Sequence, residues 1–190
     1  MLVDRKEFIK IYWKQYLLLE KEFIATDDYV TIEKINYDTY SNKYLSLLLS
    51  ICSEIDSLSA EVCKAEDDKI PQGFRNKLNI LTIHYPRILD YRVDMKFPWG
   101  IENIKPFQFK DESLEWWQAY NEVKHQRTEK NAGNRYNYTK ANLKNILFAM
   151  AALYIIERVL YDGIDYDFGD DDDLDNYKLE SQLFKSELML

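Results

Sequence analysis

Glycine and proline are absent from two long stretches of this chain, and their placement constrains the fold more than any other feature. Residues 1–70 and 134–162 contain neither residue, whereas all four prolines fall between residues 70 and 107. Because these two residue types most disfavour helix interiors, the distribution predicts helix-rich ends around an irregular middle. Together they number 5 + 4 = 9 of 190 residues, which excludes collagen-like chains and turn-rich β-sandwiches.

The spacing of apolar residues places the expected helices. It predicts helices over residues 4–24, 41–65, 74–84, 112–129 and 138–161. Asp4 can cap the first helix, and Glu7 occupies the capping-box position. The last helix contains eleven consecutive apolar residues, 146–156. That run is too short to span a membrane and is typical of a helix in the centre of a core.

The remaining segments complete an all-α domain organisation. We expect one helical-bundle domain over residues 1–161, an acidic loop over 162–176 and an amphipathic helix over 177–190. The apolar residues of that terminal helix are Leu179, Leu183, Phe184 and Leu188. Residues 92–97 and 104–109 alternate in polarity, which favours a small β-hairpin through Pro98, Trp99 and Gly100 in the irregular middle.

Charge is distributed unevenly along the chain. The net charge is −8, but residues 162–175 alone carry eight aspartates and no lysine or arginine. Without them the chain has 25 basic and 33 − 8 = 25 acidic residues. Residues 123–144 instead hold six lysines and arginines against Glu129. A basic segment this concentrated can bind a polyanion despite the low overall pI.

Cofactor and metal motifs are absent from the sequence. There is no glycine-rich phosphate loop, paired-cysteine zinc site or nucleophile elbow. An EF-hand read from Asp165 places Asp170 where glycine is required and Asn176 where glutamate is required. We therefore expect no cofactor and no metal, buried free thiols at Cys52 and Cys63, no membrane association, and a cytoplasmic location because no signal peptide begins the chain.

The residues with the clearest chemical potential lie in 116–127, which reads Trp-Trp-Gln-Ala-Tyr-Asn-Glu-Val-Lys-His-Gln-Arg. On a helix, Asn121 and His125 lie on one line, and so do Tyr120 and Lys124. Histidine exchanges protons near neutral pH, and lysine and arginine stabilise an anion. Such a set suits metal-independent cleavage of a phosphodiester. The alternative is a structural histidine at a helix end.

The pattern Trp-Trp-x-x-Tyr-Asn-x-x-Lys-His-x-Arg, followed by a loop and a long apolar helix, resembles a family of HEPN-like bacterial proteins. The acidic stretch Ser50 to Asp56 and the pair Pro106-Phe107 also resemble that family, and the likeness covers residues 40–161. It implies a bundle of four to five helices that forms homodimers. Many HEPN domains are metal-independent ribonucleases of bacterial defence or toxin–antitoxin systems, and others only bind.

The resemblance also implies roles for individual residues. In the family motif an arginine precedes a polar residue and, after a spacer, a histidine. Asn121 and His125 match this motif, whereas Tyr120 stands where the arginine is expected. The implied catalytic set is His125, Asn121, Lys124 and Arg127, with support from Glu54, Asp56 and Tyr120. RNA contacts are expected from Trp117, Lys130 and Arg135.

Two functions therefore stay open at the level of sequence. The first is an RNA-associated HEPN-like protein that acts as an endoribonuclease. The second is a non-catalytic helical module that binds a protein partner, which the 15 tyrosines, the amphipathic tail and the acidic loop favour.

Overall fold

A computed structural model describes residues 3–67, 70–110, 113–164, 177–185 and 187–189. The chain is mainly helical, as expected, with α1 (Arg5–Phe8), α2 (Lys14–Ile24), α3 (Asn42–Asp67), α4 (Phe74–His84), α5 (Glu115–His125) and α6 (Leu143–Asp162). A π-helical turn, η1 (Ile9–Trp13), joins α1 to α2. Shorter 3-10 turns are η2 (Ala25–Asp28), η3 (Lys34–Asn36) and η4 (Asn137–Lys140).

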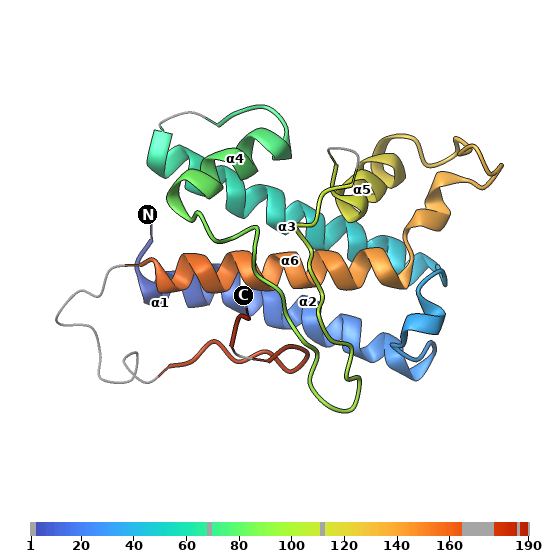
Figure 1. Ribbon diagram of the computed structural model, residues 1–190, viewed down its shortest axis with the longest axis horizontal. Helices are drawn as coiled ribbons and strands as arrows, with labels where there is room; N and C mark the ends of the chain where they lie inside the picture. Colours follow the sequence, from blue (N-terminus) through green and yellow to red (C-terminus); the bar gives the residue numbers. More distant parts are fainter. Residues whose placement is uncertain (1–2, 68–69, 111–112, 165–176, 186, 190) are drawn as a thin grey trace.

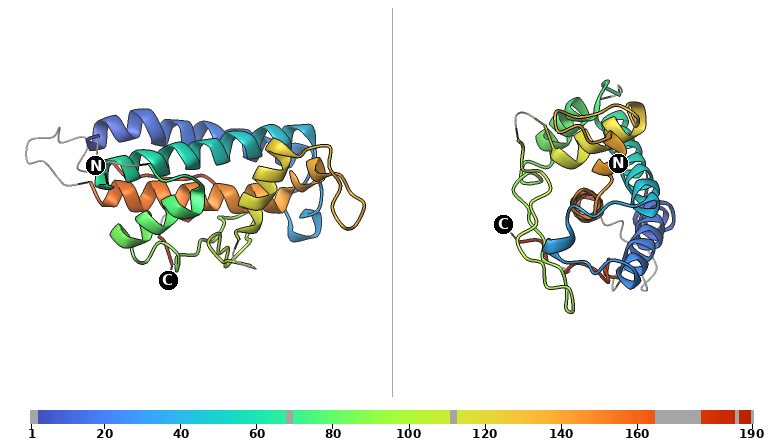
Figure 2. Two further views of the ribbon diagram at one scale, coloured as in Figure 1. Left: turned by 90° about the horizontal axis from the view of Figure 1, so that it is seen from above. Right: turned by 90° about the vertical axis from the view of Figure 1, so that its right-hand side faces the viewer.

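Helix α6 forms the centre of the molecule. It runs alongside α2 and α3 in Figure 1, and the end-on view of Figure 2 shows the other elements arranged around it. Every residue of its apolar run is buried except Phe148, which is half-buried. The short helices α4 and α5 pack beside α3. The expectation of a central core helix is thus confirmed.

Capping side chains set the starts of α1 and α6. The Asp4 carboxylate accepts a hydrogen bond from the Glu7 amide at 2.8 Å, so the first expected helix begins as predicted. Helix α6 begins at Leu143, later than expected, because the Asn142 side chain accepts from the Asn145 amide at 3.0 Å. A side chain that satisfies a free amide in this way fixes where a helix starts.

Helix α5 is shorter than expected because the chain leaves the helical conformation at Gln126. The Asn137 side-chain amide donates to the Gln126 carbonyl at 3.0 Å. Beyond it, Lys130 and Tyr136 pair in an antiparallel bridge. These interactions fold residues 126–142 into a compact turn between α5 and α6.

The expected β-hairpin is reduced to a simple reversal of the chain. Val93 pairs with Ile104 in one antiparallel bridge, and the Met95 amide donates to the Ile101 carbonyl at 2.8 Å. Gly100 lies in this reversal with φ of +62°, a conformation that favours glycine. No strand forms among the residues that the structure describes.

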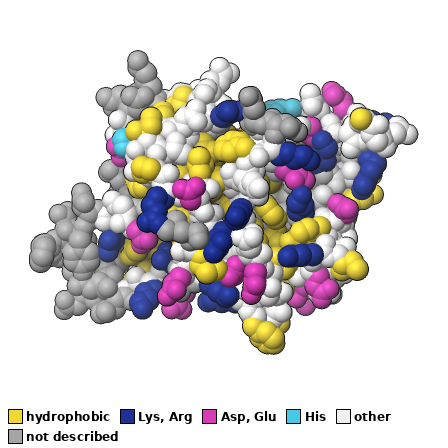
Figure 3. All heavy atoms as spheres, in the orientation of Figure 1, with side chains coloured by type: hydrophobic (Ala, Val, Ile, Leu, Met, Phe, Trp, Pro, Cys, Tyr) yellow, Lys and Arg dark blue, Asp and Glu magenta, His cyan; other side chains and the backbone are white. Residues whose placement is uncertain are grey.

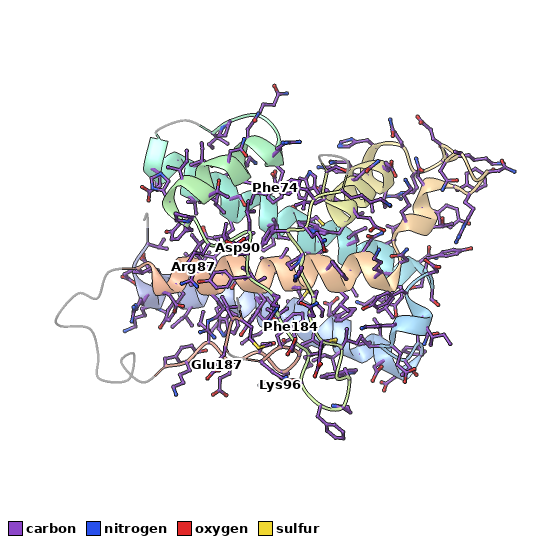
Figure 4. All side chains as sticks on the ribbon, in the orientation of Figure 1. Phe74, Arg87, Asp90, Lys96, Phe184 and Glu187 are labelled. Carbon is purple, nitrogen blue, oxygen red and sulfur yellow. The ribbon has the colours of Figure 1, made fainter. Side chains whose placement is uncertain are left out.

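The expectation of a C-terminal helix over 177–190 is wrong. In the described part of that segment, Phe184 bridges to Met95 and Met189 bridges to Arg92, so the chain is extended there. Leu179, Leu183 and Phe184 are nevertheless buried against the bundle. Figure 4 shows Phe184 and Lys96 near each other on one side of α6, and the Lys96 amide donates to the Leu183 carbonyl at 2.8 Å.

Glu20 on α2 explains why this segment is extended. Its buried carboxylate accepts from the Leu183 amide at 3.0 Å, the Gln182 amide at 2.9 Å and the Ser181 hydroxyl. Hydrogen bonds to a charged acceptor are roughly twice as strong as neutral ones. Backbone amides satisfied by a distant carboxylate do not require a helix.

Buried Glu157 is the main polar group of the core that lacks a partner. Its side chain on α6 is fully buried, and neither carboxyl oxygen has a hydrogen-bond partner among the described residues. Burial raises the pKa of the Glu157 carboxyl well above its usual range, and the neighbouring Glu54 carboxylate raises it further. The Glu157 carboxyl therefore favours its protonated form more strongly in the folded chain than in the unfolded one.

We expect Glu157→Gln to stabilise the protein at neutral pH. Because the folded pKa of Glu157 is raised, the wild type loses stability as pH rises from the unfolded value, about 4.3, toward the folded value. Glutamine removes that loss, so the two unfolding free energies should coincide near pH 4 and diverge as pH increases. Urea unfolding from pH 4 to 8 measures the difference, with exposed Glu33→Gln as the control. A constant difference across this range would contradict the prediction.

Three further sequence-based expectations concern the acidic loop, the two cysteines and the membrane. The acidic loop expected over 162–176 lies largely outside them, so its organisation stays a prediction. Cys52 and Cys63 are both buried thiols, as expected. Within the described segments, no helix combines the length and apolar character needed to cross a membrane.

Candidate functional site

Helix α5 carries the motif residues and is fixed firmly to the bundle. Its buried face includes Trp116, Tyr120 and Val123. The Trp116 indole donates to the Pro106 carbonyl at 2.7 Å, and the ring of Phe74 on α4 stacks on Trp117 at 4.2 Å between centroids. These contacts hold the opposite face of α5 outward at one end of the bundle (Figure 1).

The structure brings Asn121, His125 and Trp117 together in one pocket. Asn121 and His125 are exposed and lie one turn apart, and His125 is the last residue of α5. The pocket is open, with a volume of about 330 Å³. Ser113, Gln118, Glu122 and Gln126 complete its lining. This arrangement leaves an imidazole and an amide accessible beside an indole ring.

Tyr120 occupies a different position from the pocket residues. Only 5% of its surface is exposed, and its ring packs at 4.9 Å from the Trp117 ring. The Lys124 ammonium donates to the Tyr120 hydroxyl at 3.0 Å. This hydrogen bond is the largest cause that raises the pKa of Lys124. The side chain in place of the motif arginine therefore holds a cation but is too buried to stack on a base.

The two supporting acids point in opposite directions. Asp56 on α3 forms an ion pair with Lys77 of α4 at 2.7 Å, and its charge also acts on Lys124. Glu54, two residues earlier, is half-buried on the side of Glu157 and Tyr12. Burial raises the pKa of Glu54. Asp56 thus belongs to the surroundings of α5, whereas Glu54 does not.

The remaining cations surround the end of α5 without entering the pocket. The Arg127 guanidinium donates to the Val123 carbonyl at 3.2 Å and caps the helix. Lys130 and Arg135 are exposed in the turn that follows. The Lys130 ammonium lies 4.9 Å from the centre of the Tyr136 ring and donates to the Asn134 side chain at 3.0 Å.

Two other cations of the basic segment are neutralised by acids on α5. Lys140 pairs with Glu122, and Lys144 pairs with Glu115 at 2.7 Å. No acid lies within ion-pair distance of Lys124, Arg127, Lys130 or Arg135 among the described residues. These two ion pairs could not be predicted from the sequence, because the partners are 18 and 29 residues apart.

Metal chemistry gains no support from the described segments, where no three His, Cys, Asp or Glu side chains are grouped to hold an ion. The other histidine, His84, is exposed at the end of α4, with Nδ1 3.4 Å from Glu66. The chain offers no second imidazole near His125. Within one chain, His125 therefore supplies the single imidazole that lines this pocket.

Comparisons of the chain with protein-family models, with curated proteins and with solved structures found no match.

Proposed function

We propose that the protein binds single-stranded RNA at the end of α5 and cleaves it without a metal ion, as HEPN-like proteins of bacterial defence systems do. One observation carries the proposal: His125 and Asn121 line the same open pocket as Trp117. Exposed cations at Lys124, Arg127 and beyond follow directly along the chain. Aromatic rings that stack bases beside cations that bind phosphates are typical of single-strand recognition.

The chemistry requires a base and an acid. His125 as base accepts the proton of a ribose 2′-hydroxyl while O2′ attacks the adjacent phosphorus. The P–O5′ bond breaks, and the leaving 5′-oxygen takes a proton from water or from the second His125 of a dimer. The products are a 2′,3′-cyclic phosphate and a 5′-hydroxyl. Asn121 would orient the phosphate, and Lys124 and Arg127 would stabilise its charge.

Incubation of the full chain with total RNA and with tRNA in EDTA tests this function. Fragments that end in 2′,3′-cyclic phosphate support it. RNA that stays intact with the wild-type protein, under conditions where the protein binds RNA, would remove cleavage from the proposal and leave binding.

RNA binding is expected to depend on the exposed cations around α5. The slope of log K against log salt should become shallower by about 0.7 for each phosphate of a single strand that a variant no longer binds. We expect this change for Arg127→Ala and Arg135→Ala, measured by fluorescence anisotropy with a labelled oligoribonucleotide. Exposed Lys14→Ala on α2 is the control and should leave the slope unchanged. Equal slopes for all variants would place the RNA elsewhere on the protein.

We expect the protein to form a homodimer in which both His125 side chains lie near the two-fold axis. A two-fold interface places the same patch opposite itself, which supplies the second imidazole that the acid step can use. Light scattering should give about 46 kDa, twice the 22.8 kDa of one chain. A mass near 23 kDa across micromolar concentrations would exclude the two-histidine site.

A non-catalytic interaction module remains the second candidate, and one surface favours it. An apolar pocket of about 330 Å³ lies where η2 meets the start of α3, lined in part by Ala25, Val30 and Tyr44. Tyr29, which also lines this pocket, is 89% exposed, and Ile35 nearby along the chain is 86% exposed. If the protein does not bind RNA at low salt, binding of a protein partner becomes the favoured function.

A further inference from the structure

A third pocket lies on the face of the molecule shown in Figure 3, where lysine and arginine side chains border hydrophobic ones near α5 and the start of α6. Its volume is about 340 Å³. It is lined chiefly by Lys105, Gln108, Phe109, Lys110, Lys144 and Phe148. It shares no residue with the His125 pocket: α5 contributes Glu115 and Trp116 here, and it contributes Trp117, Gln118, Asn121, Glu122 and His125 there.

The backbone of this pocket is held in place by hydrogen bonds. Lys110 and Ser113 exchange two backbone hydrogen bonds, at 2.8 and 2.9 Å. The indole of Trp116 fixes the Pro106 carbonyl at 2.7 Å. The segment that carries Lys105 and Lys110 is therefore hydrogen-bonded at both ends to residues at the start of α5. Sites whose supports are already ordered lose less entropy on binding.

The charge of the pocket favours an anion. Three ammonium groups line it, and Glu115 is the one carboxylate among the described lining residues. Glu115 is already paired with Lys144 at 2.7 Å. Lys105 and Lys110 are exposed, and no acid lies within ion-pair distance of either among the described residues. These two ammonium groups are therefore available to an anion in the pocket.

The apolar part of the pocket favours a flat ring. Phe109 is 40% exposed and Phe148 is half-buried. The Lys144 ammonium lies 5.9 Å from the centre of the Phe148 ring, so ring and cation are adjacent. Base–aromatic stacking beside a phosphate-binding cation is the combination that a nucleotide satisfies. The Gln108 amide adds a donor and an acceptor for the edge of a base.

We propose that this pocket binds one nucleotide, with the base against Phe109 and Phe148 and the phosphate at Lys105 and Lys110. The nucleotide comes either from an RNA strand or from a free mononucleotide. Nucleotide binding at this pocket does not require His125, so it can be tested independently of RNA cleavage.

Calorimetric titration of the full chain with AMP, UMP and inorganic phosphate at low salt tests the pocket. We expect saturable binding of both nucleotides, and weakening by about fivefold or more in Phe109→Ala and in Lys110→Ala. Both substitutions are at exposed positions and spare the core. Exposed Lys34→Ala on η3 is the control and should bind nucleotides as the wild type does.

Three results would overturn the proposal: no saturation by either nucleotide up to about 10 mM, equal affinity for inorganic phosphate, or equal weakening in the Lys34→Ala control. A short oligoribonucleotide separates the two sources. If it binds at least about tenfold tighter than AMP and Phe109→Ala abolishes that difference, the pocket holds one unit of a strand. Similar affinities indicate a free nucleotide. If the protein binds nucleotides at this pocket but does not cleave RNA, the catalytic function is rejected and the nucleotide site is supported.

Discussion

His125→Ala should lower the rate of RNA cleavage by about 10²–10⁴-fold in EDTA while leaving RNA affinity nearly unchanged. A positioned histidine contributes a factor of this size when it transfers a proton in the transition state. It need not contribute to ground-state affinity. The expected result follows from the position of His125, which is exposed, ends α5 and lines the pocket with Asn121.

The chain provides a matched control for this experiment. His84 is the only other histidine, is also exposed and also ends a helix, α4, where it faces Glu66. His84→Ala should cleave RNA at the wild-type rate. Single-turnover rates with a labelled RNA give the comparison, and anisotropy gives the affinity. If both alanine variants cleave as fast as the wild type, His125 has no part in proton transfer.

Ala152→Asp should lower the melting temperature by about 10–20 °C or prevent folding. Ala152 is fully buried in α6, at the centre of the bundle. An unpaired charge in such a position costs several kcal/mol. For a domain of this size about 1 kcal/mol corresponds to 2–4 °C, so about 5 kcal/mol gives the expected range.

The control for this substitution is the same change at an exposed site. Ala132 lies exposed in the turn between α5 and α6, and Ala132→Asp should change the melting temperature by no more than about 2 °C. Circular dichroism at 222 nm follows both variants. An Ala152→Asp protein that melts with the wild type would show that α6 is not the centre of the core.

Interactions between residues close together in the chain were sufficient to predict most helices. The apolar run 146–156 predicted the central position of α6, and the Asp4 cap predicted the start of the first helix. Both depend on residues close together in the chain. The C-terminal segment was different, because the spacing of Leu179 and Leu183 places them on one face of a helix and also on one face of an extended chain. Glu20, far away in sequence, determined the outcome.

For the candidate site too, the sequence predicted some features and tertiary packing decided the others. The helical spacing of Asn121 and His125 was enough to place them side by side on α5, and the structure adds that both are exposed in one pocket. The burial of Tyr120, the orientation of Glu54 away from α5, and the pairing of Lys140 and Lys144 with acids of α5 depend on packing between helices. The sequence determined by itself the main helices of the bundle and the face that each buries, because these follow from interactions three or four residues apart. Only the tertiary structure decided which charges are neutralised and how the C-terminal segment is held, because those interactions join residues that are distant in the chain.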